Sequence, residues 1–157
     1  MGTDAPIATL VASLRHNADL VDHFRQTGSE HDYDWEERWV RDEGYMKVAV
    51  GTIRQCLLNA SAVAAEVAHF VMPAPLARFN DAVAKRLGIP AAALVSAQHE
   101  TAGDPGCAQP LAMLDAALRA AAPGVLVLVA AFGSGCAARR CPARAPRPAP
   151  AGLRPAT

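Results

Sequence analysis

The chain has 157 residues, of which 52% are hydrophobic, and its formal net charge at pH 7 is zero. This length suits a single domain with its own core, and no apolar run approaches the roughly 18 residues of a transmembrane helix. Residues 136–157 contain five arginines and no acidic residue, so residues 1–135 carry a net charge of −5. The N-terminal sequence lacks the basic and apolar regions of a signal peptide, and we therefore expect a cytoplasmic protein without a membrane partner.

The first two predicted segments differ sharply in composition. Residues 5–26 place apolar side chains at three- and four-residue spacing, which predicts a helix. Residues 30–47 contain both tryptophans and both tyrosines among many charged side chains. Two interpretations of this second segment are open. It is either a surface for a substrate or partner, or a loop in which Trp35 and Trp39 cover the edge of the core.

The remainder alternates short apolar runs with amphipathic segments. Gly44 precedes a predicted helix over residues 45–59, whose inward face has apolar residues at spacings near 3.6 (Met46, Val50, Ile53 and Leu57). Further along, we predict a helical turn at 62–66, strands at 69–72, 93–97 and 125–132, and helices at 75–87, ended by Gly88, and 110–122. Apolar strands separated by helices indicate an α/β fold in which helices cover both faces of a small, parallel-rich sheet.

The four cysteines do not form a recognisable metal or disulfide pattern. Cys56, Cys107, Cys136 and Cys141 include no C-x-x-C pair, and no histidine stands at zinc-finger spacing from them. We therefore predict buried free thiols and no metal site. Cys107 follows Gly106 near a predicted helix start, where a nucleophilic thiolate is the alternative to an inert thiol.

Residues 136–157 differ in composition from everything before them. Five of the chain's twelve prolines and five arginines lie there, without apolar periodicity. This composition predicts a disordered tail that begins directly after Gly135. Scattered arginines without interleaved aromatic residues argue against a nucleic-acid partner. A reading-frame shift in the coding sequence is the other interpretation of so abrupt a change.

Several stretches in the second part of the chain resemble one enzyme family. "GYMKVAV", "AVAKRLGIP", a Gly-Asp loop with the helix after it, and "PGVLVLVAAFGSG" resemble the C-terminal half of the thiolase superfamily over residues 45–135. The nearest branch is 3-oxoacyl-[acyl-carrier-protein] synthase III, with its hydroxymethylglutaryl-CoA synthase relatives. The resemblance implies a thiolase-like half-domain with helices layered around a small mixed sheet. It also implies dimers and acyltransferase chemistry in fatty acid biosynthesis, in which a cysteine of the first half accepts the acyl group before a Claisen condensation.

The family pattern assigns roles to particular residues of this chain. Arg78 and residues 84–88 fit the frame of the helix that follows the family's catalytic histidine, so the histidine position falls on Pro73, which has no titratable group. The family's asparagine position falls on Asp104, for which a simple turn aspartate is the alternative. His99 is a second catalytic candidate, or else a hydrogen-bonded loop histidine. The resemblance further suggests substrate contacts at four glycines: Gly103, Gly106, Gly133 and Gly135.

Two departures from the family pattern limit the expected chemistry. No residues resemble the first half with its cysteine, residues 1–44 resemble the connecting region between the halves, and the last strand expected after Gly135 is replaced by the Arg/Pro-rich residues 136–157. We therefore predict a truncated homologue of a condensing enzyme that is inactive alone, uses acyl-CoA or acyl-carrier protein as substrate, and needs no cofactor. The alternative is a non-catalytic, acyl-CoA-binding or dimerisation subunit, which pairs with a separate N-terminal half or with itself.

Overall fold

A computed structural model describes residues 6–20, 23–31, 33–74, 77–97, 103, 105–133 and 135–142. Its centre is a four-stranded mixed sheet in the order β1-β6-β5-β4. The strands are β1 (Ala12–His16), β4 (Val67–Val71), β5 (Leu126–Gly133) and β6 (Gly135–Pro142). β4 and β5 are parallel, whereas β6 is antiparallel to both β5 and β1. A single parallel bridge from Phe70 to Leu94 extends the sheet beyond β4.

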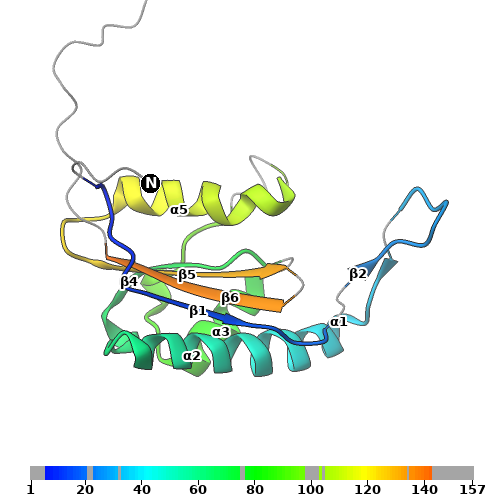
Figure 1. Ribbon diagram of the computed structural model, residues 1–157, viewed down its shortest axis with the longest axis horizontal. Coiled ribbons are helices and arrows are strands. Elements are labelled where there is room, and N and C mark those ends of the chain that lie inside the picture. Colours follow the sequence, from blue (N-terminus) through cyan, green and yellow to red (C-terminus); the bar gives the residue numbers. More distant parts are fainter. Residues whose placement is uncertain are drawn as a thin grey trace, which may run out of the picture.

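Helices cover both faces of this sheet (Figure 1). One face carries a continuous helical run of α1 (Glu37–Trp39), a π-helical stretch (Val40–Ala49) and α2 (Val50–Asn59), together with α3 (Ala77–Leu87). The opposite face carries α5 (Gln109–Ala120). Short 3₁₀ turns lie at Ala64–Glu66, Ala91–Ala93 and Gly106–Ala108. A two-stranded hairpin of β2 (His23–Phe24) and β3 (Tyr33–Asp34) projects from the body. None of the helices in the described part of the chain is both long and apolar enough to cross a membrane.

The alternation of side chains along β4 and β5 creates two apolar clusters. Phe70, Leu126 and Leu128 pack with residues of α2 and α3, while Val127 and Val129 pack with α5 on the other face. Successive side chains of a strand point to opposite faces, so a continuous apolar run supplies both clusters. This explains why the strand at 125–132, predicted from an uninterrupted apolar run, is confirmed within one residue.

The predicted helix over residues 5–26 is wrong. Residues 12–16 form β1, paired in register with β6 from Ala12↔Arg140 to His16↔Cys136, and residues 23–24 form β2. Within β1, Ala12 and Leu14 pack against the larger apolar cluster. Side chains two positions apart lie on one face of a strand, so this packing and the pairing with β6 outweigh the helical spacing of the segment.

The helix predicted from residue 45 begins earlier, at Glu37. Gly44 lies inside the helical run instead of preceding it, and a Cβ atom at this position would lie 2.8 Å from Leu20 Cδ2. The glycine therefore allows a close approach of the preceding segment. The predicted inward face is confirmed at Val50, Ile53 and Leu57, which are buried.

The expected loss of the last strand is also wrong. Residues 135–142 form β6, which pairs along its whole length with β5 and lies between β5 and β1. The boundary at Gly135 was drawn from composition, but backbone pairing in a sheet tolerates small and polar side chains. Residues 143–157, the rest of the predicted tail, lie outside the described residues.

The other predicted elements are found with small shifts. The helices at 75–87 and 110–122 correspond to α3 and α5, and the turn at 62–66 to the 3₁₀ turn Ala64–Glu66. Gly88 ends α3 with φ of 78°, a left-handed conformation that favours glycine. The strand predicted at 69–72 begins at Val67, whereas the one predicted at 93–97 is reduced to the bridge at Leu94.

Candidate functional site

The topology selects one edge of the sheet as the candidate site. β4 and the bridging residue Leu94 are parallel neighbours. After β4 the chain continues to α3 on one face of the sheet, whereas after Leu94 it continues to α5 on the opposite face. In α/β sheets, ligands bind outside the carboxyl ends of strands at such points. We call this edge, with Met72–Ala74 after β4 and the start of α5, the carboxyl edge.

The turn after β4 contributes no proton-transferring group in its described part. Met72 and Ala74 are buried and Pro73 is partly buried. Pro73, to which the resemblance assigns the family's histidine position, therefore lies at the carboxyl edge. His69 lies four residues earlier within β4, about 13 Å along the strand, and does not reach this turn.

The start of α5 lies at the same edge. Gln109, its first residue, is buried, and its Nε2 donates a hydrogen bond to the carbonyl oxygen of Ala97. Gly103 and Gly106 are exposed and have φ of 70° and 60°, so each of these predicted substrate-contact positions requires the conformational freedom of glycine. Cys107 lies in the turn before α5 and is exposed, so the prediction of buried thiols is wrong for it, whereas Cys56 is buried in α2.

The other two predicted glycines also lie at the carboxyl edge. Gly133 and Gly135 face each other across the hairpin that joins β5 to β6. β5 runs parallel to β4 and continues past the residue paired with Val71, so its carboxyl end is at the same edge as Pro73. The fold thus brings together the glycines and the proline predicted from the sequence. The two remaining candidates, His99 and Asp104, lie outside the described residues.

Two polar side chains at this edge were not predicted. Among the described residues, the buried side-chain atoms without a hydrogen-bond partner are Asn80 Oδ1 and Gln109 Oε1. Asn80 lies in the first turn of α3, and both helices begin at the carboxyl edge. Each residue occupies a core-facing position of an amphipathic helix: Asn80 lies one turn before Val83, and Gln109 lies one turn before Met113. A polar residue at an apolar position was the sequence signal that would have identified them.

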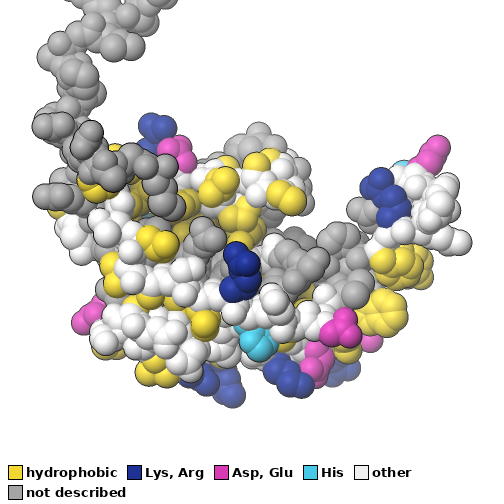
Figure 2. All heavy atoms as spheres, in the orientation of Figure 1, with side chains coloured by type: hydrophobic (Ala, Val, Ile, Leu, Met, Phe, Trp, Pro, Cys, Tyr) yellow, Lys and Arg dark blue, Asp and Glu magenta, His cyan; other side chains and the backbone are white. Residues whose placement is uncertain are grey.

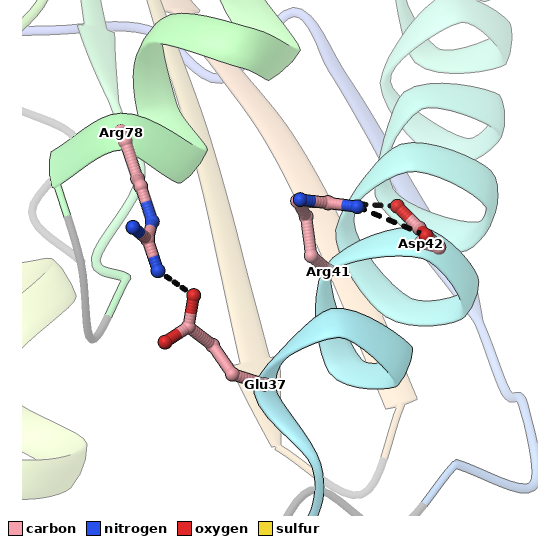
Figure 3. A network of polar contacts seen from close by, with 4 residues as sticks. All are labelled: Glu37, Arg41, Asp42 and Arg78. Carbon is pink, nitrogen blue, oxygen red and sulfur yellow. Dashed lines mark hydrogen bonds and ion pairs between the residues drawn. The ribbon is translucent and has the colours of Figure 1, made fainter.

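One arginine–carboxylate pair joins α3 to α1, and a second lies within the π-helical stretch (Figure 3). Arg78, at the start of α3, forms an ion pair with Glu37 of α1, and its guanidinium lies 5.9 Å from the Phe79 ring centroid. Arg41 donates two hydrogen bonds to Asp42, from Nε to Oδ1 at 2.7 Å and from Nη2 to Oδ2 at 3.1 Å. The hydrogen bond from Arg41 lowers the pKa of Asp42, and the same bond raises the pKa of Arg41. No group of three His, Cys, Asp or Glu side chains suited to a metal ion occurs in the described part.

The aromatic residues of 30–47 divide between the two interpretations left open by the sequence. Trp39 packs against the core, as expected for a residue that covers its edge, but Trp35 is 49% exposed. Its ring lies 6.3 Å from Phe24 and 5.9 Å from Trp39, and Phe24 lies 5.3 Å from Tyr33. Hydrophobic side chains accordingly gather where the hairpin leaves the body (Figure 2). This aromatic row therefore combines a core contact with an exposed surface.

Comparison with solved structures defines the class of the fold. A 3-oxoacyl-(acyl carrier protein) synthase III from Pseudomonas aeruginosa matches 92% of this chain and 47% of its own, with a TM-score of 0.72 and 19% identity. The enzyme of the same name from Aquifex aeolicus matches 88% of this chain and 46% of its own, with a TM-score of 0.74 and 16% identity. OleA from Xanthomonas campestris matches 86% and 40%, with a TM-score of 0.71 and 18% identity. The chain thus has a thiolase-like fold and spans less than half the length of these proteins.

Sequence comparison identifies the family. The sequence model of the 3-oxoacyl-[acyl-carrier-protein (ACP)] synthase III C-terminal domain matches residues 57–141. The chain belongs to this family. The match extends into β6, which agrees with the corrected boundary of the domain. A search of curated protein sequences finds no significant match.

Proposed function

We propose that the chain contributes the C-terminal half of a condensing acyltransferase that acts on acyl-CoA or acyl-carrier protein thioesters in the cytoplasm. The observation that carries this proposal is the carboxyl edge itself. It lies in a domain of the 3-oxoacyl synthase III family, and it holds the glycines and the vacant histidine position that the family pattern places there. The proposal assigns substrate binding to this edge and requires no resident cofactor or metal.

The 157 residues by themselves are proposed not to catalyse the condensation. The relatives' fold is about twice as long as the part matched here, and the nucleophilic cysteine of the family pattern has no counterpart in this half. At Pro73, the side chain cannot donate a hydrogen bond to the oxyanion that forms during acyl transfer. Asp104, if it takes the asparagine position, would oppose that charge when ionised. Backbone N–H groups would have to supply the stabilisation.

Acyl transfer to the chain tests this proposal directly. The purified chain is incubated with radiolabelled acyl-CoA, with and without a malonyl donor, and protein-bound label is measured after denaturation. We expect neither a stable acyl-enzyme nor a condensation product. Label retained on any cysteine of the chain, Cys107 in particular, would contradict the assignment of the nucleophile to another half.

A second candidate function is that of a non-catalytic subunit that binds acyl-CoA or mediates dimerisation. The exposed row of Phe24, Tyr33 and Trp35 favours it, because exposed aromatic clusters are typical of protein interfaces. Co-expression with an N-terminal condensing-enzyme half distinguishes the candidates. A stoichiometric complex without condensing activity supports the non-catalytic subunit, and a homodimer of the chain supports self-association. A complex that catalyses condensation, or aggregation of the chain both alone and on co-expression, contradicts the second candidate.

A further inference from the structure

A buried glutamine at the start of α5 has no part in the function proposed above. Gln109 is buried, with an exposed fraction of 4%. Its Nε2 donates to the carbonyl oxygen of Ala97, twelve residues earlier. Ala97 lies shortly after Val95, whose N–H donates to the carbonyl oxygen of Phe70 at 3.1 Å. The bond therefore connects the start of α5 to the end of the segment that pairs with β4.

Stability alone does not explain a glutamine at this position. Its Oε1 is buried without a hydrogen-bond partner, and a buried polar atom without a partner lowers the stability of the fold. A leucine, which has a similar size, would remove the bond to Ala97 but would also remove the unpaired oxygen. The two effects oppose each other, so their sum is small. What the glutamine adds over leucine is a fixed distance between two parts of the backbone.

The surrounding backbone makes this one bond effective. Pro110, the second residue of α5, stiffens the start of the helix, and the Ala108 N–H donates to the carbonyl oxygen of Pro105 at 3.3 Å. Next to this stiff unit lie the left-handed residues Gly103 and Gly106. A side-chain bond at the junction therefore fixes the direction in which the chain enters α5.

We propose that Gln109 is a positioning residue of the carboxyl edge. It holds the backbone at Ala97 next to the start of α5. The functional meaning of this anchor rests on the function proposed above. The hydrogen bond itself is a property of the chain, and its effect can be measured without an assay of enzymatic activity.

Hydrogen exchange followed by mass spectrometry on the full chain tests the anchor. Gln109→Leu should lower the protection of amides within residues 95–111 by about two- to tenfold, the effect of losing one hydrogen bond. The thermal midpoint and the protection of β5 should stay at the wild-type values. Gln55→Leu is the matched control, because Gln55 is an exposed glutamine bonded to Asn59 within α2, and it should leave residues 95–111 unchanged.

A glutamate at the same position separates the hydrogen bond from the shape of the side chain. Burial raises the pKa of a carboxyl group, so Gln109→Glu is protonated at about pH 5 and can donate to Ala97, but loses that hydrogen when the pH rises above the raised pKa. After correction for intrinsic exchange rates, its protection should equal wild type at the lower pH and fall at the higher one, whereas wild type stays constant.

Three outcomes would overturn the proposal: unchanged protection in Gln109→Leu, a pH-independent glutamate variant, or wild-type amides in residues 95–111 that exchange at the intrinsic rate. Acyl labelling is independent of all these measurements. An acyl-enzyme on this chain would refute the proposed function and leave the anchor intact.

Discussion

The face of the sheet covered by α5 depends on one large side chain of that helix. Met113 is fully buried in one cluster with Val71, Val127 and Val129, and Ala117 is the other buried residue of α5 in this cluster. Met113→Ala removes three heavy atoms from this site. Their transfer from water contributes about 2 kcal/mol, and with the cavity left behind the expected loss of unfolding free energy is about 3 kcal/mol. For a chain of this size, that corresponds to a fall of roughly 6–12 °C in Tm.

Chemical denaturation followed by circular dichroism measures this loss, with a constant slope against denaturant as the condition for comparison. Leu111→Ala is the control, because Leu111 lies on the same helix but is 68% exposed, and its substitution should cost less than about 0.5 kcal/mol. The reasoning would be refuted if the two variants were equally stable. Such a result would mean that α5 does not pack against β4 and β5 through Met113.

Three further predictions concern single positions. Gly88→Ala forces a side chain into the left-handed conformation at the end of α3, and should lower the unfolding free energy by about 1–2 kcal/mol, as measured by denaturation; an unchanged midpoint would exclude a left-handed Gly88. The hydrogen bond from Arg41 lowers the pKa of Asp42, so the pair stabilises the fold above about pH 4, and this contribution disappears as the pH falls through the lowered pKa. The unfolding free energy of Asp42→Asn should therefore be lower than that of wild type at pH 7 and converge with it in acid. The difference should be small because both side chains are exposed. Pro73→His, placed in an intact condensing enzyme that contains this half, should raise the condensation rate, and an unchanged rate would show that Pro73 does not occupy the histidine position.

The elements that were predictable from the sequence are those in which side chains decide the structure. β5 has an uninterrupted apolar run because both of its faces are covered, and α3 has an apolar stripe through Phe79 and Val83 that ends at Gly88. In contrast, β1 and β6 depend mainly on backbone pairing: β1 pairs with a strand far away in the sequence, and β6 pairs with both β1 and its hairpin neighbour β5. Small and charged residues such as Arg139 and Arg140 are compatible with such pairing, so composition predicted a tail where the fold has a strand.

The part of the candidate site that resembles the family pattern was predictable from the sequence. A gap-free frame assigns the histidine position to Pro73, and separate resemblances single out the glycines at 103, 106, 133 and 135; in the structure, Pro73, Gly133 and Gly135 lie at one edge of the sheet. Gln109 and Asn80 were not predicted because neither side chain is titratable or nucleophilic. Their significance comes from burial and from an unpaired oxygen, which only the packed structure reveals.

The pairing of β1 with β6 also has a consequence for how the protein folds. Ala12 pairs with Arg140, so the sheet gains this strand only after a very long loop closes. Contacts of such sequence separation slow folding, because the entropy of closure is lost before the contacts form. On the ribosome, β1 emerges early and waits for its partner until β6 has been synthesised. Until then the edge of β1 is open to other strands, and a chaperone that shields this edge should raise the yield of folded protein.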